Sequence, residues 1–143
     1  MQIKDLLDQK RGTMISVPPG TVIPGAAVVL AKQSVGAAII AGPDAKILGI
    51  LSERDITRAV AEHGAKIAEM PVEALMVEDV ITCGAATNIA EAMNIMQVNH
   101  IRHLPVVEND TLIGIVSIGD VVKRRIMETE LEANALREYI TTG

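Results

Sequence analysis

The chain has 143 residues and is 49% hydrophobic, yet it holds no Phe or Trp and one Tyr, so its core must be built from aliphatic side chains and Met. A formal net charge of −5 argues against a nucleic-acid-binding protein, because that function needs a basic surface. No apolar stretch reaches the ~20 residues that cross a bilayer, residues 1–12 lack the apolar centre of a signal peptide, and a single cysteine excludes an intrachain disulfide, so we expect a cytoplasmic protein.

An internal repeat organises the sequence. Residues 15–21 match residues 81–87 at an offset of 66, and the offset becomes 65 after the following hairpin turn. Thr21 and Thr87 each precede a helical segment and are the expected N-caps. The predicted elements are, in chain order, a strand at 15–17, a helix at 22–33, strands at 37–40 and 47–51, a helix at 56–62, a connector at 63–76 in which Pro71 opens a short helical turn, a strand at 81–83, a helix at 88–98, strands at 104–107 and 112–116, and a helix at 121–139.

Each half therefore reads strand, helix, strand, strand, helix, which predicts a mixed α/β (α+β) fold. We place the first half, with an N-terminal helix and the connector, at residues 1–70, and the second half, with its extended C-terminal helix, at residues 71–143. A half of this size buries little surface alone. We therefore expect the two halves to pack sheet to sheet about a pseudo-twofold axis.

The last helix is longer than its counterpart and carries a heptad-like apolar stripe. The stripe steps by four and three residues through Val122, Ile126, Thr129, Ala133, Leu136 and Ile140. Two interpretations stay open, packing on its own domain and pairing with a second copy of the chain.

The closest match between the halves is the block Gly49–Asp55 over Gly114–Asp120. Its Ser and Asp, three residues apart, resemble a capping box, although that motif prefers Glu or Gln as the acid. A glycine in a strand permits the close approach of a ligand, and the following helix start favours a phosphate. The Asp can accept hydrogen bonds from two neighbouring hydroxyls, as in a ribose.

The doubled Gly-hydrophobic-x-Ser-x-x-Asp block, each copy after a strand hairpin, resembles the CBS (cystathionine-β-synthase) domain in tandem, also called the Bateman module. The resemblance covers about residues 10 to 127, and Ile101–Val107 is similar to the family's second-strand motif. It implies a regulatory module without catalytic activity that binds AMP, ADP, ATP, NAD(H) or S-adenosylmethionine, one cleft per half. Such a module requires no cofactor.

The resemblance also assigns roles to individual residues. Asp55 and Asp120 would bind ribose hydroxyls, with Ser52 and Ser117 near the ribose or phosphate. The positions that would clamp the adenine are Val17, Gly36, Ala37, Cys83, His103, Leu104 and Pro105. The remaining candidates for nucleotide binding are Arg54, Arg102, Ile118, Gly119, Lys123 and Arg124.

The two clefts are not equivalent in charge. Arg54 lies between Ser and Asp in the first block, where the second has Gly119, and Arg102 and His103 replace a glycine and an alanine. The second half also carries the basic run 123–125. We therefore expect the cleft around Asp120 to be the stronger anion site.

Other kinds of site find little support. His100, His103 and Cys83 suggest a metal site, but residues three apart along a strand point to opposite faces, and no denser cluster accompanies them. Cys83 has no partner base, and no nucleophile–base pair or Walker motif is present, so an enzyme is not expected. We expect a homodimer that signals to an unknown protein partner and contacts neither nucleic acid nor membrane. The alternative functions are a structural dimer with weak or no nucleotide binding and a detached regulatory subunit of an enzyme.

Overall fold

The computed structural model describes residues 1–9, 15–44 and 46–142. The chain divides into two compact units, which do not coincide with the two halves of the sequence. The first-repeat unit is Thr13–Ile81, and the second-repeat unit joins Met1–Gly12 to Thr82–Gly143.

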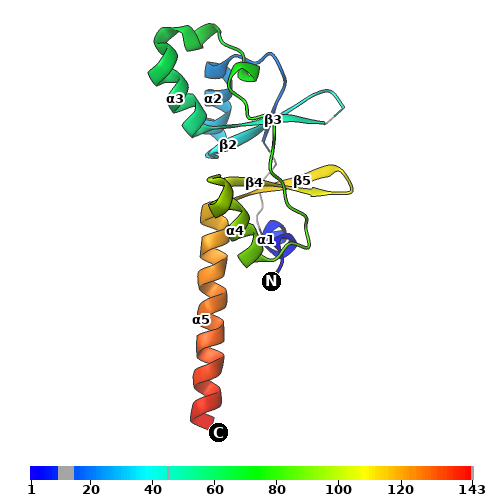
Figure 1. Cartoon of the computed structure of the whole chain (residues 1–143), viewed down its shortest axis with the longest axis vertical. Helices are drawn as coiled ribbons and strands as arrows, with labels where there is room; N and C mark the ends of the chain where they lie inside the picture. The colour runs from blue at the N-terminus through cyan, green and yellow to red at the C-terminus, as the bar shows by residue number, and fades with distance from the viewer. Residues whose placement is uncertain (10–14, 45, 143) are drawn as a thin grey trace. The chain divides into compact units, whose positions relative to one another are not determined.

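The first-repeat unit holds a three-stranded sheet with helices packed on it (Figure 1). Strand β2 is central, parallel to β1 and antiparallel to β3. The elements of this unit are β1 (Ser16–Val17), α2 (Ile23–Gln33), β2 (Ala37–Ala41), β3 (Ile47–Ser52), α3 (Glu53–His63) and the 3₁₀ helices η1 (Gly64–Glu69) and η2 (Val72–Ala74).

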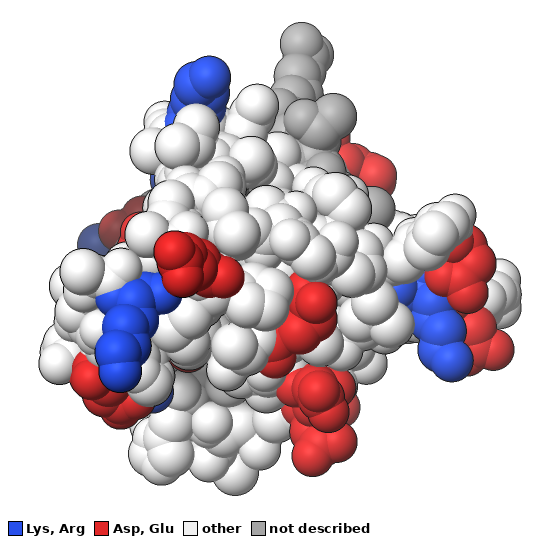
Figure 2. All heavy atoms as spheres, turned by 90° about the horizontal axis from the view of Figure 1, so that it is seen from above, with Lys and Arg blue, Asp and Glu red and all other residues white. Residues whose placement is uncertain are grey.

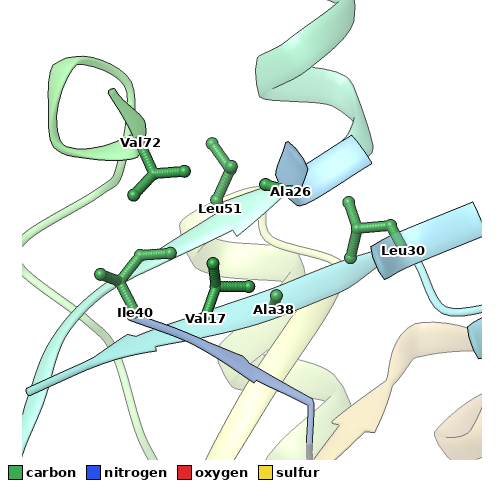
Figure 3. Close-up of a cluster of buried hydrophobic side chains, with 7 residues drawn as sticks. All are labelled: Val17, Ala26, Leu30, Ala38, Ile40, Leu51 and Val72. Atoms are coloured by element: carbon green, nitrogen blue, oxygen red, sulfur yellow. The ribbon is translucent and has the colours of Figure 1, made fainter. Parts of the chain in front are cut away.

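The core of this unit is aliphatic, as the composition requires. Side chains alternate between the faces of a strand, so Ala38 and Ile40 of β2 share one face with their partners Leu51 and Val17. Figure 3 shows these side chains on the face that α2 covers. The buried cluster consists of Val17, Ala26, Leu30, Ala38, Ile40, Leu51 and Val72.

The second-repeat unit repeats this plan around a two-stranded antiparallel sheet. Its elements are α1 (Ile3–Gln9), α4 (Ile89–Asn99), β4 (His103–Glu108), β5 (Thr111–Ser117) and α5 (Ile118–Thr142). The hairpin turns through Asn109 and Asp110, whose positive φ angles of 50° and 61° suit a tight two-residue turn. The strand predicted at 81–83 is reduced to one parallel bridge between Cys83 and Val106.

The expected N-caps are displaced by one residue. Val22 and Asn88 hold the cap positions of α2 and α4. The Asn88 side chain accepts a hydrogen bond from the backbone N–H of Glu91, whereas Val22 has no side chain that can do so. Thr21 instead donates its hydroxyl to the Pro18 carbonyl, and Thr87 accepts from the N–H of Gly84. Both threonines therefore stabilise the turn before the helix.

A short closing segment packs on each unit, around Ile3 in the second-repeat unit and around Val72 in the first-repeat unit. Each closing segment comes from the neighbouring repeat in the sequence. In the second-repeat unit, the N–H of Ile3 donates to the Thr87 carbonyl at 2.8 Å. In the first-repeat unit, Val72 makes the equivalent bond to Thr21, also at 2.8 Å. The N-terminal helix expected in the first half therefore packs in the second-repeat unit. The boundary between repeats that we drew at residues 70 and 71 stays a prediction.

Among the described helices, none combines the length and the apolar character that crossing a membrane requires.

Candidate functional site

The two Ser-x-x-Asp blocks have the same geometry at the start of a helix. In the first, Asp55 Oδ2 accepts from the N–H of Ser52 at 2.9 Å and from its hydroxyl at 3.0 Å. The Ser52 Oγ accepts in turn from the N–H of Asp55 at 3.3 Å. In the second, Asp120 Oδ2 accepts from the N–H of Ser117 at 3.0 Å, and the N–H of Asp120 donates to Ser117 Oγ at 3.1 Å. Both blocks are therefore reciprocal capping boxes, and the shorter Asp does serve as the acid.

The first strand of each hairpin, β2 or β4, brings further candidate residues to the capping boxes. Ala37 pairs with Ser52 across β2 and β3, and His103 pairs with Ser117 across β4 and β5. The carbonyl of Gly36 accepts from the N–H of Glu53 at 2.9 Å. The carbonyl of Arg102 accepts from the N–H of Ile118 at 2.8 Å in the same way. Each unit thus gathers a strand start, a capping box and a helix N-terminus, which together offer hydroxyl, carboxylate and backbone N–H groups to a polar ligand.

Some candidate residues lie on the other face of their sheet. Val17 is 2% exposed and belongs to the helix-covered core, so its side chain does not share a face with Ala37 (Figure 3). Leu104 is likewise fully buried, and it alternates with His103 and Pro105 along β4. A ligand beside the capping boxes would meet Val17 and Leu104 through the backbone only.

Cys83 is buried beside β4, where its N–H donates to the Pro105 carbonyl at 3.0 Å. Burial raises the pKa of the Cys83 thiol to about 11, with a further increase from the Glu91 charge and an opposing effect of the hydrogen bond with Thr87. Since the thiolate is the reactive form, the geometry gives Cys83 the character of a small apolar side chain.

The glycines of the two blocks make room for the protein itself. A Cβ on Gly49 would lie 2.8 Å from Met76 Cγ and Sδ and 2.9 Å from the Val77 carbonyl oxygen. A Cβ on Gly114 would lie 2.7 Å from Leu7 Cδ2. From the sequence we expected a ligand to make this close approach. The structure corrects that interpretation, because the closing segment of each unit occupies the space.

The basic candidates are distributed unevenly. Arg54, Gly119 and Lys123 are exposed at the helix starts. Arg124 contacts the Met1 sulfur. Both residues line a groove of about 930 Å³ that is formed by α5, α1 and the start of α4. That groove is separate from the capping boxes, since neither Asp120 nor Ser117 lines it.

Two further observations bear on the function classes. Within residues 1–9, 15–44 and 46–142, no three His, Cys, Asp or Glu side chains gather as a metal site would need. On the face drawn in Figure 2, Lys and Arg side chains lie in separate places, some of them beside Asp or Glu side chains, and do not merge into one basic patch.

Comparison with known proteins gives a consistent family match. The model of the CBS domain family matches residues 3–62 and 72–126. The CBS domain-containing protein CBSX3, mitochondrial, of Arabidopsis thaliana is 35% identical over 118 residues, which are 80% of this chain and 57% of that protein. The chain thus spans little more than half the length of that relative.

Two solved structures are similar over most of the chain. The CBS-domain containing protein ATU1752 from Agrobacterium tumefaciens has 40% identity and a TM-score of 0.84, covering 87% of this chain and 99% of its own. The CBS domain protein PAE2072 from Pyrobaculum aerophilum, complexed with AMP, has 32% identity and a TM-score of 0.79, covering 93% of this chain and 99% of its own.

Proposed function

The chain belongs to the CBS domain family, and on that premise we propose that it is a regulatory module that binds an adenosine nucleotide and catalyses no reaction. The observation that carries the proposal is the duplicated capping box, which puts a carboxylate, a hydroxyl and a helix N-terminus at the same place in each unit. The AMP bound to the relative PAE2072 supports the choice of an adenosine ligand. We propose the cytoplasm as its compartment, although the Arabidopsis relative is described as mitochondrial.

The proposed roles follow from the chemistry of the groups. A carboxylate has about four acceptor sites, and Asp55 uses two of them within its capping box, which leaves acceptor capacity for two ribose hydroxyls. The N–H groups and the dipole at the starts of α3 and α5 suit the phosphate. Gly36, Ala37, Arg102, His103 and Pro105 are the proposed contacts to the base, from the neighbouring strand ends.

We further propose that the site around Asp120 binds anionic ligands more strongly. Arg102, His103 and Lys123 stand in its unit, where the first-repeat unit offers Arg54. Titration calorimetry with AMP and NADH on Asp55→Asn and Asp120→Asn tests this. The amide keeps one oxygen for the capping bond, so each change weakens the hydroxyl contacts more than the fold. We expect Asp120→Asn to lose the greater share of binding, and equal losses would contradict the asymmetry.

The test of nucleotide binding itself is a thermal-shift screen of the unmodified protein with AMP, ADP, ATP, NADH and S-adenosylmethionine. A ligand at 100 times its Kd adds ~2.7 kcal/mol to the free energy of unfolding. A shift with one or more of these ligands supports the proposal, and inosine monophosphate at the same concentration is the control for the base.

A second candidate function is a structural or interaction dimer, or a detached regulatory subunit, with weak or no nucleotide binding. It is favoured by one observation, that capping and internal packing already account for both Asp residues and both glycines. No shift with any adenosine ligand would support it. In either case we propose that the chain acts as a homodimer and that a protein partner responds to it.

A further inference from the structure

The C-terminal part of α5 leaves an apolar stripe exposed. Figure 1 shows α5 extending far beyond α1 and α4, the helices it packs against. The large side chains of the heptad-like stripe are open to solvent, with Ile126 54%, Leu136 61% and Ile140 70% exposed. From Val122 to Ile140 the stripe is about 27 Å long. An aliphatic stripe of this length on a single helix is suited to a second helix.

The spacing assigns heptad positions to the stripe. Ile126, Ala133 and Ile140 fall at position a, and Val122, Thr129 and Leu136 fall at position d. Ile126 and Ile140 at a with Leu136 at d match the side chains that favour two strands over three or four in parallel coiled coils, whereas Thr129 and Ala133 add little buried surface. The buried side of α5, which includes Val121, lies about a quarter turn away from the stripe, so the stripe is not the surface that packs on the unit.

Charged residues border the stripe, and they distinguish the two possible orientations of a second helix. Positions g are Arg125, Glu132 and Tyr139, and positions e are Lys123, Glu130 and Arg137. In a parallel pair, a g residue faces the e residue five positions later on the other helix. Arg125 then faces Glu130 and Glu132 faces Arg137, so every such pair is attractive.

The antiparallel arrangement that buries the same stripe is repulsive. Position e then faces e and position g faces g, so Glu130 meets Glu130 of the second copy and Glu132 meets Glu132. Lys123 and Arg137 meet as well. Like charges at these positions oppose association.

We propose that α5 forms a parallel, in-register pair with α5 of a second copy of this chain. This deepens the homodimer of the proposed function and does not depend on nucleotide binding. The complementary charges at 125 with 130 and at 132 with 137 select the orientation, and the a and d side chains supply the buried surface.

Cysteine cross-linking tests the register. Leu136→Cys places one thiol at a d position, where a parallel in-register pair brings it beside its counterpart. Cys83 is buried and does not compete. We expect mild oxidation to convert the Leu136→Cys chain into a covalent dimer, and Glu138→Cys, on the opposite side of the helix, to cross-link far more slowly. A dimer in sedimentation equilibrium without selective cross-linking at 136 would overturn the parallel pairing but leave the homodimer standing. A monomer would overturn both, and neither result affects the thermal-shift test of nucleotide binding.

Charge reversal tests the orientation by sedimentation equilibrium. Glu132→Lys and Arg137→Glu each turn two attractive pairs into repulsive ones, which should weaken the dimer by about 5- to 30-fold. The double variant restores attraction and should return to within about threefold of the unmodified chain. Glu138→Lys makes the same charge change away from the stripe and is the control. Tighter association of Arg137→Glu would show the antiparallel arrangement, and equal effects of the 132 and 138 changes would remove the role of the charges.

Discussion

At the residue scale, the two block glycines are equivalent in sequence but meet different atoms. A Cβ on Gly114 would press on the end of the Leu7 side chain, which can change rotamer. A Cβ on Gly49 would press on both Met76 and the backbone carbonyl of Val77, which bridges to Ile50. The backbone contact is the less adaptable of the two.

We therefore expect Gly49→Ala to lower the free energy of unfolding by about 1–3 kcal/mol, as overpacked cores do, and Gly114→Ala to cost less. Urea denaturation of the two variants measures the difference. Combining Gly114→Ala with Leu7→Ala tests the mechanism, because the second change removes the clashing atoms. A Gly49→Ala variant as stable as the unmodified protein would contradict the packing role.

Cys83 gives a second prediction at this scale. Burial and a raised pKa of about 11 leave little thiolate at pH 8. Ellman's reagent should react slowly with the native protein and rapidly once urea unfolds it. The fold holds the thiol in its neutral form, so this group favours folding below its unfolded pKa near 9.0 and loses that contribution as the pH rises through about 11. Fast labelling of the native protein at pH 8 would be inconsistent with the buried position.

At the element scale, α2 and α4 provide a natural comparison of helix caps. The backbone angles at Val22 (φ −74°, ψ 151°) and Asn88 (φ −78°, ψ 161°) are nearly identical. Only Asn88 supplies a side-chain acceptor to its helix. Pro24 lies in the first turn of α2, where a missing N–H breaks no helical bond.

Asn88→Ala should therefore cost about 1 kcal/mol of stability, and Val22→Asn should gain a fraction of that amount, because it adds the missing acceptor in a backbone that already suits it. Thermal unfolding of the two variants gives the sign and size of each change. Stabilisation by Asn88→Ala would show that packing outweighs the cap. A loss of stability on Val22→Asn that exceeds the expected gain would show the same.

At the scale of the whole molecule, each unit is closed by a segment that belongs to the other repeat in sequence. Ile3 and Val72 are both fully buried and make equivalent backbone bonds. The residues at the start of the chain are consequently part of the core of the second-repeat unit. Removing an N-terminal segment that packs in this way would lower the stability of the unit, whereas removing a disordered tail would not.

Ile3→Ala should destabilise the protein by about 2–5 kcal/mol, the range for truncating a buried aliphatic side chain. Lys4→Ala, one residue along and exposed, is the matched control and should be near neutral. Urea denaturation measures both. Equal and small effects would mean that α1 contributes nothing to the unit.

The sequence by itself determined the order and kind of the elements in both repeats. Short β-branched runs separated by turn residues predicted β2 to β5 with bounds within one residue at each end. The two helices that follow the Ser-x-x-Asp blocks were predicted to begin at residues 56 and 121, whereas α3 and α5 begin three residues earlier, at Glu53 and Ile118, directly after the capping Ser. Local interactions of this kind are contained in the sequence itself.

Only the tertiary structure decided which distant residues meet. The side chains that lie over Gly49 and Gly114 come from segments about 27 and 107 positions away along the chain, and periodicity carries no information on such contacts. The same reason explains why the sequence could not show that α1 packs in the second-repeat unit or that Val17 faces the core. Local sequence therefore fixes the kind and the approximate bounds of each element, whereas packing between elements fixes its neighbours.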